Sequence, residues 1–351
     1  MTEKKCLKFA GVEIENAPIE QPIEIKNRNK DFVVFGENNL FPQYLYSCYA
    51  DCSLLQSLCN GTAQYISGAG FTDETTENKV INTKGETLLN LASRVALDFI
   101  IYGAFALQIR RDTFGEIASV DYVDVSNVRL SENGESIYYN GGWGKYSRQG
   151  KAYPRFNPNE KQINSVFYFK NPISKGLYGL PMWSASLKEI RTLIEISDFH
   201  LSSIRNGLHS PFIINFNNGR PTDEEQHILE ELIKDKFTGS GNAGKFILSF
   251  NENKESAADI VSVPSDNYDT KYIQLKETAT EALLTSFRAS AQLFGVSSQS
   301  TGFSSIEYRD SFALFNGTVI QPIQMQIEQA FATIGLEFEF ATFEISFENN
   351  D

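Results

Sequence analysis

The sequence predicts an α+β fold in which two long amphipathic helices flank a small strand-helix-strand unit. Apolar residues recur at helical spacing over two stretches, 182–206 and 271–295, each long enough for a rod of roughly 37 Å. The segment between them, 207–270, holds two short β-rich runs around a capped helix. A strand-rich region, 103–169, precedes the first long helix. Helices and strands are therefore expected in separate parts of the chain.

The composition is that of a globular protein with an acidic surface. The chain has 351 residues, of which 41% are hydrophobic and 13% aromatic, enough for a substantial core. It lacks a run of 18 apolar residues, and its first residues lack the apolar core of a secretory signal, so we expect no membrane partner and assembly in a cytoplasm. The net charge of −13 argues against tight binding to phosphates, so any DNA contact should be weak.

The region before the first long helix is predicted to contain both helices and strands. Glycines and prolines mark the turns, and alternation or helical periodicity marks the elements. The expected elements are an extended arm at 7–26, a turn at 35–42, a helix at 42–67 ended by Gly68 and Gly70, and a helix at 87–102. Two strands, at 105–110 and 119–125, should follow, with a turn at 112–115 between them.

Two sets of residues could suggest a metal site, and we interpret both as structural. Cys48, Cys52 and Cys59 are spaced for one face of a helix, but no histidine is close in sequence, so these cysteines and Cys6 are expected to be small thiols, mostly buried, rather than zinc ligands. Asp121 and Asp124 fall on opposite faces of a strand, which favours solvated surface. No metal and no cofactor are predicted.

The second half of the chain contains the long helices. The first should begin near Pro181 and end before Gly207, with an apolar stripe that comprises Leu187, Ile190, Ile194, Leu201 and Ile204. The remaining expected elements are a strand at 210–216, a helix with Thr222 and Glu225 as its capping box, a strand at 245–250, a second long helix that ends at Phe294, a hydroxyl-rich loop, a helix at 306–334 interrupted at Asn316-Gly317 and Pro322, and a β-pair at 336–340 and 343–347.

One glycine-rich segment resembles a nucleotide-binding loop. Gly239 to Lys245 fits most of the P-loop pattern, but it follows a predicted helix and opens a strand, the reverse of the order that such a loop needs. Phe246 stands where a Ser or Thr must ligate magnesium. The histidines, His200, His209 and His227, lack an adjacent nucleophile. The sequence gives no positive indication of an enzyme, and a nucleotide-binding enzyme remains an alternative.

Several motifs in this order resemble the portal proteins of tailed bacteriophages, especially the short PBSX-type portals. The likeness spans about 35–331, with two departures: Ala289-Ser-Ala-Gln lacks the family's second proline, and little chain follows Ile334. The motifs are Phe35-Gly-Glu-Asn-Asn-Leu-Phe-Pro, Tyr178-Gly-Leu-Pro-Met-Trp, Arg205-Asn-Gly-Leu-His-Ser-Pro-Phe-Ile, Gly239 to Lys245, Phe287-Arg through Leu293-Phe-Gly-Val, the 303–315 region, and Ile320-Gln-Pro.

The resemblance implies a portal fold with little or no helical crown. Its expected parts are an α/β wing at 1–181, stem helices at 182–206 and 271–295, a small α/β clip at 207–270, a tunnel loop at 296–305, a kinked wing helix at 306–335 and a C-terminal β segment at 336–351. It further implies a non-enzymatic subunit of a dodecameric ring in the virion, at the head-tail vertex, through which double-stranded DNA is packaged and ejected. The implied partners are the terminase large subunit, a head-completion or neck adaptor protein and the major capsid protein. Another phage connector or adaptor is a second alternative.

The resemblance also assigns candidate site residues. The clip segment 207–264 holds five Lys or Arg and nine Asp or Glu, which suggests a channel that tolerates DNA without holding it. That the hydroxyl-rich loop is only a surface turn stays open. The candidates are Ser297, Ser298, Gln299, Ser300 and Thr301 facing DNA, with Phe303 as their anchor; Arg220, Glu224, Glu231, Lys234 and Lys236 for docking; and Ile194, Leu283 and Phe287 for contact between subunits.

Overall fold

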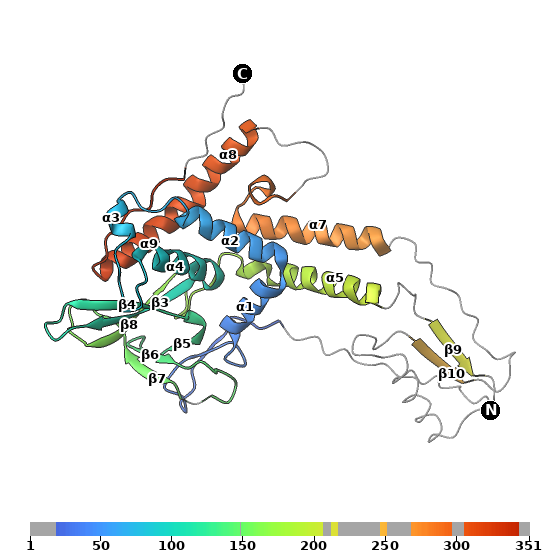
Figure 1. Cartoon of the computed structure of the whole chain (residues 1–351). Coiled ribbons are helices and arrows are strands. Elements are labelled where there is room, and N and C mark those ends of the chain that lie inside the picture. Colours follow the sequence, from blue (N-terminus) through green and yellow to red (C-terminus); the bar gives the residue numbers. More distant parts are fainter. Residues whose placement is uncertain are drawn as a thin grey trace. The chain divides into compact units, whose positions relative to one another are not determined.

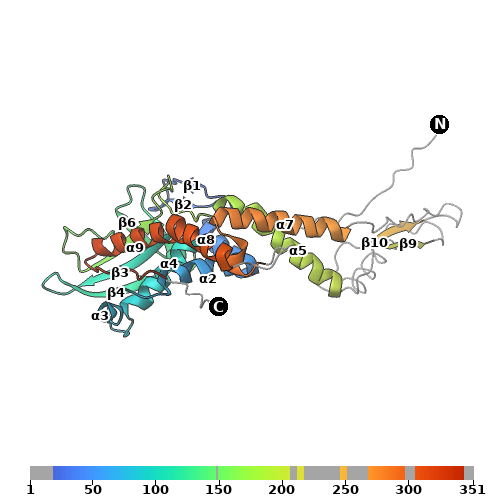
Figure 2. The ribbon, with the colours of Figure 1, turned by 90° about the horizontal axis from the view of Figure 1, so that it is seen from above.

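The computed structural model describes residues 19–147, 149–205, 212–216, 246–250, 268–296 and 305–343 (Figures 1 and 2). It divides into two compact units, one formed by Ile19–Leu193 with Glu277–Asp351 and the other by Ile194–Lys276 with Met1–Pro18. Both boundaries within the described chain fall inside long helices. The α+β class predicted from the sequence is confirmed, since helices and antiparallel strands occupy separate parts of the larger unit.

The larger unit contains most of the described elements. Its strands are β1 (Glu24–Ile25), β2 (Val34–Phe35), β3 (Ala104–Arg111), β4 (Ile117–Val123), β5 (Val128–Leu130), β6 (Ser136–Tyr139), β7 (Lys151–Pro154) and β8 (Asn164–Lys170). Its helices are α1 (Phe41–Asp51), α2 (Ser53–Ser67), α3 (Glu74–Glu77), α4 (Leu88–Tyr102), α8 (Ser305–Phe315) and α9 (Gln321–Thr333), with a π-helical segment at Asn316–Ile320. The long helices α5 (Leu187–Arg205) and α7 (Tyr268–Phe287) cross the unit boundary, and the smaller unit also holds β9 (Phe212–Phe216) and β10 (Phe246–Phe250).

A three-stranded antiparallel sheet with β3 in its centre forms the framework of the larger unit. The strands predicted at 105–110 and 119–125 are confirmed as β3 and β4, and β8 pairs with the other edge of β3. Helices α4 and α9 lie over this sheet (Figure 1). Phe105 on β3 lies 6.4 Å from Phe99 of α4 and 6.2 Å from Phe331 of α9 between ring centroids. These buried aromatic rings join the sheet to both helices.

Two of the motifs quoted above meet in space, although 143 positions separate their aromatic residues. The rings of Phe35 and Tyr178 stack with centroids 4.4 Å apart. Asn39 has a φ of 63°, and its side-chain oxygen accepts a hydrogen bond from the Phe35 N–H at 3.2 Å. A side chain at Gly179 would bring a Cβ within 2.2 Å of the Gly103 carbonyl oxygen. Both motifs therefore hold the core together.

The predicted single helix at 42–67 is wrong, because the chain breaks it into α1 and α2. Cys52 adopts an extended conformation, with φ −104° and ψ 104°, between the two helices. The interpretation of the cysteines as thiols is confirmed for Cys48, Cys52 and Cys59, which are free and buried. Cys6 lies outside the described residues. The apolar stripe continued across the break, so periodicity alone did not reveal it.

The expectation that Asp121 is solvated is also wrong. Its side chain is buried and accepts hydrogen bonds from Arg110 at 2.6 Å and Ser119 at 2.8 Å, while the Lys84 ammonium lies 3.3 Å away. Burial alone would raise the pKa of Asp121, but these donors together hold it below its usual value. Asp124 caps a short helical turn through the Ser126 N–H. Strand alternation could not show that cations from a neighbouring strand and loop would surround Asp121.

The predicted first long helix and the two strands that follow it are confirmed, except that the helix begins at Leu187, after a 3-10 turn at Ser184–Ser186, rather than near Pro181. Helix α5 is continuous from Leu187 to Arg205, and β9 and β10 pair in parallel, with Phe246 opposite Phe212. Parallel neighbouring strands need a crossover connection rather than a tight hairpin. The helix predicted from Thr222 would provide that crossover, but it lies outside the described residues.

The last third of the chain departs from the prediction in two places. The second long helix ends at Phe287, not at Phe294. The β-pair is not formed in its described part, because Phe338 and Phe340 pack on Phe71 and residues 336–343 contribute only a bridge between Phe340 and Phe71. The interruption predicted at Asn316-Gly317 is confirmed as the π-helical segment, with Pro322 in the first turn of α9. No helix follows α9 within residues 334–343.

Candidate ring and channel elements

Most of the predicted site residues lie outside the described part of the chain. The DNA-facing candidates Ser297 to Thr301 and Phe303 belong to the segment 297–304, and the docking candidates Arg220, Glu224, Glu231, Lys234 and Lys236 belong to 217–245. The structure does describe the residues on either side of the first segment, Val296 and Ser305, and the two strands that flank the second, β9 and β10. The geometry of these supports is therefore the starting point for the site.

An aromatic cluster fixes the chain just before the loop 297–304. Phe294 packs edge-on against Phe315 of α8 with centroids 5.8 Å apart, and Tyr65 of α2 lies 6.1 Å from Phe294 and 5.9 Å from Phe315. The Tyr65 hydroxyl donates to the Leu293 carbonyl at 3.3 Å. Burial and a hydrogen bond with a neighbouring tyrosine raise the pKa of Tyr65, so the phenol stays protonated. The chain that leads to residue 297 is thus held by packing against α2 and α8.

Gly61 makes this contact possible. An added Cβ at Gly61 in α2 would lie 2.7 Å from the Phe294 ring, closer than real side chains approach. Only glycine lets α2 and the chain before the loop approach so closely without displacing the ring.

A tight turn separates α7 from this aromatic cluster and explains the early end of the helix. Arg288 has a φ of 53°, a conformation that non-glycine residues seldom adopt, and the Ala289 N–H donates to the Leu284 carbonyl at 3.0 Å. A short 3-10 turn, Ala291–Phe294, follows and ends at Gly295 with φ 68°. A helix end with a positive φ usually contains glycine or asparagine. Because Arg288 occupies that position here, sequence analysis did not predict the end of α7.

The three residues predicted to contact neighbouring subunits are buried within the chain itself. Leu283 and Phe287 have no exposed surface, and Ile194 is 8% exposed. A side chain without exposed area cannot contribute a new contact unless the subunit rearranges. In this structure Leu283 and Phe287 therefore act as core residues that hold α7 in the larger unit.

The smaller unit instead exposes apolar residues on both long helices. Phe199 of α5 stacks on Tyr272 of α7, with centroids 4.8 Å apart, and this pair joins the two helices. Leu201 and Ile204 of α5 are 47% and 67% exposed. On α7, Ile273 and Leu275 are 53% and 50% exposed. Large apolar side chains gathered on one pair of helices mark a surface suited to association.

The described residues show little that could support catalysis. They contain no group of three or more His, Cys, Asp or Glu side chains that could hold a metal ion, and none of their helices is long and apolar enough to span a membrane. His200 is exposed and packs near Phe199 and Tyr272. The glycine-rich segment 239–245 lies outside the described part, but it leads directly into strand β10, which is the wrong element for a phosphate loop.

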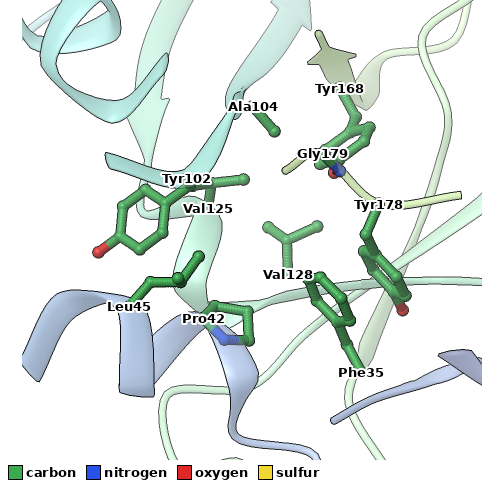
Figure 3. A pocket seen from close by; sticks show the side chains of 10 residues that line it. All are labelled: Phe35, Pro42, Leu45, Tyr102, Ala104, Val125, Val128, Tyr168, Tyr178 and Gly179. Carbon is green, nitrogen blue, oxygen red and sulfur yellow. The ribbon is translucent and has the colours of Figure 1, made fainter. Parts of the chain in front are cut away.

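Figure 3 shows a small pocket in the larger unit, lined by aromatic and aliphatic side chains. Two of its three tyrosine hydroxyls are bound to the backbone, and the third, that of Tyr102, forms a hydrogen bond with the Ser126 side chain and points away from the pocket. The Tyr168 hydroxyl accepts from the Gly179 N–H at 3.1 Å, and the Tyr178 hydroxyl accepts from Leu130 N–H at 3.0 Å and donates to the Val33 carbonyl. Since no convergent polar group is left to orient a ligand, the pocket is better explained as a packing gap.

The comparison with protein families decides the family. The family model described as phage portal protein matches residues 83–350. The chain belongs to the phage portal protein family.

The portal-family assignment agrees with individual relatives. The chain is 23% identical over 262 residues to a probable portal protein of Escherichia phage P2, covering 74% of this chain and 72% of that protein. It is 22% identical over 175 residues to the phage-like element PBSX protein XkdE of Bacillus subtilis (strain 168), covering 40% of this chain and 35% of that protein. The resemblance to short PBSX-type portals is thereby confirmed.

Solved structures show that the portal fold extends beyond recognisable sequence similarity. A chain from the neck of an empty gene transfer agent particle matches with a TM-score of 0.56 and 13% identity, covering 85% of this chain and 83% of that one. A chain from the neck of a native gene transfer agent particle, computed with C12 symmetry, matches with a TM-score of 0.55 and 12% identity, covering 88% and 86%. At this identity the likeness establishes the shared fold alone.

Sequence analysis missed three features of the chain between α7 and residue 297. It did not find the anchoring role of Tyr65, the close approach at Gly61 or the stop at Arg288. Tyr65 belongs to a predicted helix, and no local pattern indicated that its partners lie more than 200 positions away. Gly61 inside a helical pattern was the one available signal, because such a glycine often marks close packing.

Proposed function

We propose that the chain is the ring-forming portal subunit of a phage or phage-like particle, located at the head-tail vertex of the virion. The main support for this proposal is the portal family match over residues 83–350, together with two long helices that flank a parallel strand pair. In this proposal, double-stranded DNA passes through the ring without a chemical step by this chain. The portal family to which the chain belongs is structural.

The proposed ring contains twelve copies, and its lateral contacts involve the exposed apolar residues of the long helices. The C12 symmetry is that of the native gene transfer agent neck whose chain shares this fold. Leu201, Ile204, Ile273 and Leu275 supply the apolar area, and a second copy is the occupant that the proposal assigns to them. A ring contact is heterologous, so the helices of one copy face a different surface of the next.

Docking and channel roles are assigned to the segments that join these helices. The clip at 207–270, with Arg220, Glu224, Glu231, Lys234 and Lys236, would dock the terminase large subunit and later a neck adaptor protein, and the wing would face the major capsid protein. The loop with Ser297 to Thr301 would line the narrowest part of the channel. Its support is the aromatic cluster of Phe294 and Tyr65, which would hold such a loop at a fixed distance from the axis.

Mass measurement and negative-stain imaging of the purified full chain test this proposal. A closed ring of twelve copies is the expected result. A chain that remains a monomer at micromolar concentration, or that turns over ATP in a manner dependent on Lys245, contradicts it and favours the enzyme alternative. A ring of another size would retain the portal family and change the proposed stoichiometry.

A further inference from the structure

The charge of this acidic chain is distributed unevenly, and two short segments carry cations without any acid. Residues 26–30 and 136–159 together hold seven of the 31 Lys and Arg residues and none of the 44 Asp and Glu residues. The rest of the chain is correspondingly more acidic than the net charge of −13 indicates. The two segments are the turn between β1 and β2 and the region that covers β6, the β6–β7 loop and β7.

The fold brings these segments together. The Lys30 ammonium donates to the Lys145 carbonyl at 3.3 Å, which joins the turn to the loop. Beneath them, Phe32 and Trp143 are buried and pack edge-on with ring centroids 4.6 Å apart. Tyr138 on β6 lies 6.0 Å from Phe32. A shared aromatic cluster therefore fixes both cationic segments on one surface, which we call the cationic face and define as the described residues of 26–30 and 136–155.

Three cations of this face have no acidic partner among the described residues. Among the described residues no carboxylate lies within ion-pair distance of Arg28, Lys145 or Lys151. Lys26 does have an acidic partner, since its ammonium lies 2.6 Å from Glu132, and two further acids, Asp31 and Glu135, border the segments directly. Even with these three acids, the six described Lys and Arg residues give the face a positive net charge.

A buried arginine, Arg129, adds to the positive electrostatic potential of the cationic face. Arg129 has no exposed surface, and its guanidinium lies 5.2 Å from the Trp143 ring centroid. Its hydrogen bonds end on neutral oxygens, those of the Asn39 side chain and of the Asn39, Ser126 and Val128 backbone. Burial lowers the pKa of Arg129 to about 10, so it remains charged near neutral pH without a carboxylate partner. In a low-dielectric interior such a charge is screened little.

The other exposed side chains of the face suit phosphate rather than a mixed protein surface. Asn27, Asn29 and Gln149 are exposed amide donors, and Tyr146 is 85% exposed. Phosphate oxygens in protein–DNA complexes accept hydrogen bonds from this set of side chains, namely Arg and Lys together with Ser, Asn, Gln and Tyr. A protein partner would normally present cations as well as acids, and the face has few acidic groups to pair with such cations.

From this geometry we infer that the cationic face binds the phosphate backbone of double-stranded DNA, weakly and without sequence preference. This site is separate from the proposed channel loop, and the inference does not depend on ring formation. Three or four cations on one subunit give low affinity and steep salt dependence. Such a surface would hold DNA loosely against the larger unit, whereas the acidic remainder of the chain would repel it.

The test is fluorescence anisotropy of a labelled DNA duplex titrated with the full chain at several salt concentrations. The patch variant is R28E/K145E/K151E, and the matched control is K79E/K188E/R309E, which replaces three exposed cations on other elements and changes the net charge equally. We expect the patch variant to lose roughly tenfold or more in affinity and its salt slope to fall by about two to three, while the control stays within about threefold of the unmodified chain. Equal thermal unfolding of the three proteins establishes that all are folded.

Three outcomes overturn the inference. If the unmodified chain does not bind duplex at low salt, the face is not a DNA site. If patch and control variants lose affinity equally, net charge alone is responsible. If polyglutamate competes as well as unlabelled duplex at equal charge, the face fits an acidic protein instead. A monomeric chain that binds duplex through Arg28, Lys145 and Lys151 would refute the proposed ring and retain this inference, so the two failures are distinguishable.

Discussion

The apolar stripe of α5 continues along the helix, but its burial does not. Leu187 and Ile190, in the larger unit, are buried, whereas Leu201 and Ile204, in the smaller unit, are largely exposed. Helix α7 shows the same contrast in the opposite chain direction, since Ile273 and Leu275 are exposed and Leu283 is buried. Apolar periodicity therefore predicts that one face of a helix will be buried. It does not predict whether the same chain or another chain covers that face.

The strongest test of this contrast places a charge at the buried end of α7. Leu283→Asp should destabilise the subunit by about 4 kcal/mol or more, because an unpaired carboxylate would occupy a fully buried position. Leu275→Asp on the same helix is the matched control, and at an exposed position it should cost less than about 0.5 kcal/mol. Urea unfolding measures both free energies. Equal stability of the two variants would show that the buried end of α7 is not part of the core.

A second test enlarges a residue at the base of the loop. Gly61→Val should destabilise the larger unit by about 1–3 kcal/mol, because its side chain would collide with the Phe294 ring. Ser57→Val, at an exposed position of the same helix, controls for the effect of valine on α2. Thermal unfolding provides the comparison. If Gly61→Val is no less stable than Ser57→Val, the approach of α2 to Phe294 is not tight.

A third test uses the pH dependence of a buried acid in α4. Burial raises the pKa of Asp98 well above its usual value, a hydrogen bond from Tyr122 opposes this, Asp124 adds to the rise and Arg94 opposes it. Its Oδ2 atom has no hydrogen-bond partner among the described residues. Because the folded-state pKa lies above the unfolded one, the contribution of Asp98 to stability is complete below pH of about 4 and is lost as pH rises toward the folded-state pKa.

Asp98→Asn should remove this dependence. The free energy of unfolding of the unmodified protein should fall relative to that of the variant by up to about 1.4 kcal/mol per pH unit above pH 4, until the folded-state pKa is reached. Urea unfolding between pH 4 and pH 8 measures the difference. Parallel pH profiles for the two proteins would mean that the Asp98 pKa is not raised by folding.

A small effect on subunit stability is also expected at the exposed end of α5. Leu201→Asp combined with Ile204→Asp should change the free energy of unfolding by no more than about 1 kcal/mol, since both side chains are exposed. The same double variant should no longer form the proposed ring, and analytical ultracentrifugation measures this loss. Thr278→Asp, exposed on α7, is the control that should still assemble. Intact rings from the double variant would move the lateral contact elsewhere.

Sequence analysis found some parts of the candidate site and not others, as it did for the long helices. Sequence analysis found a hydroxyl-rich stretch with Ser297 to Thr301 from its composition, and the resemblance to portal proteins assigned that stretch to the channel; the assignment remains a prediction. It assigned Leu283 and Phe287 to contacts between subunits, whereas both side chains are buried within the chain, because a helical stripe looks the same whether it faces a core or a neighbour. It also did not find the cationic face, since residues 26–30 and 136–155 become one surface only when Phe32 packs on Trp143.

The sequence by itself determined the features that depend on neighbouring residues in the chain. Periodicity defined α4 and α5, alternation defined β3 and β4, and the order of motifs indicated the portal family before any comparison. Only the tertiary structure decided where α1 and α7 end, that Asp121 is paired and that Arg129 is buried without an acid. The last two depend on groups distant in the chain, such as Lys84 for Asp121 and Asn39 for Arg129, and their energies arise from burial and contacts that no local pattern encodes.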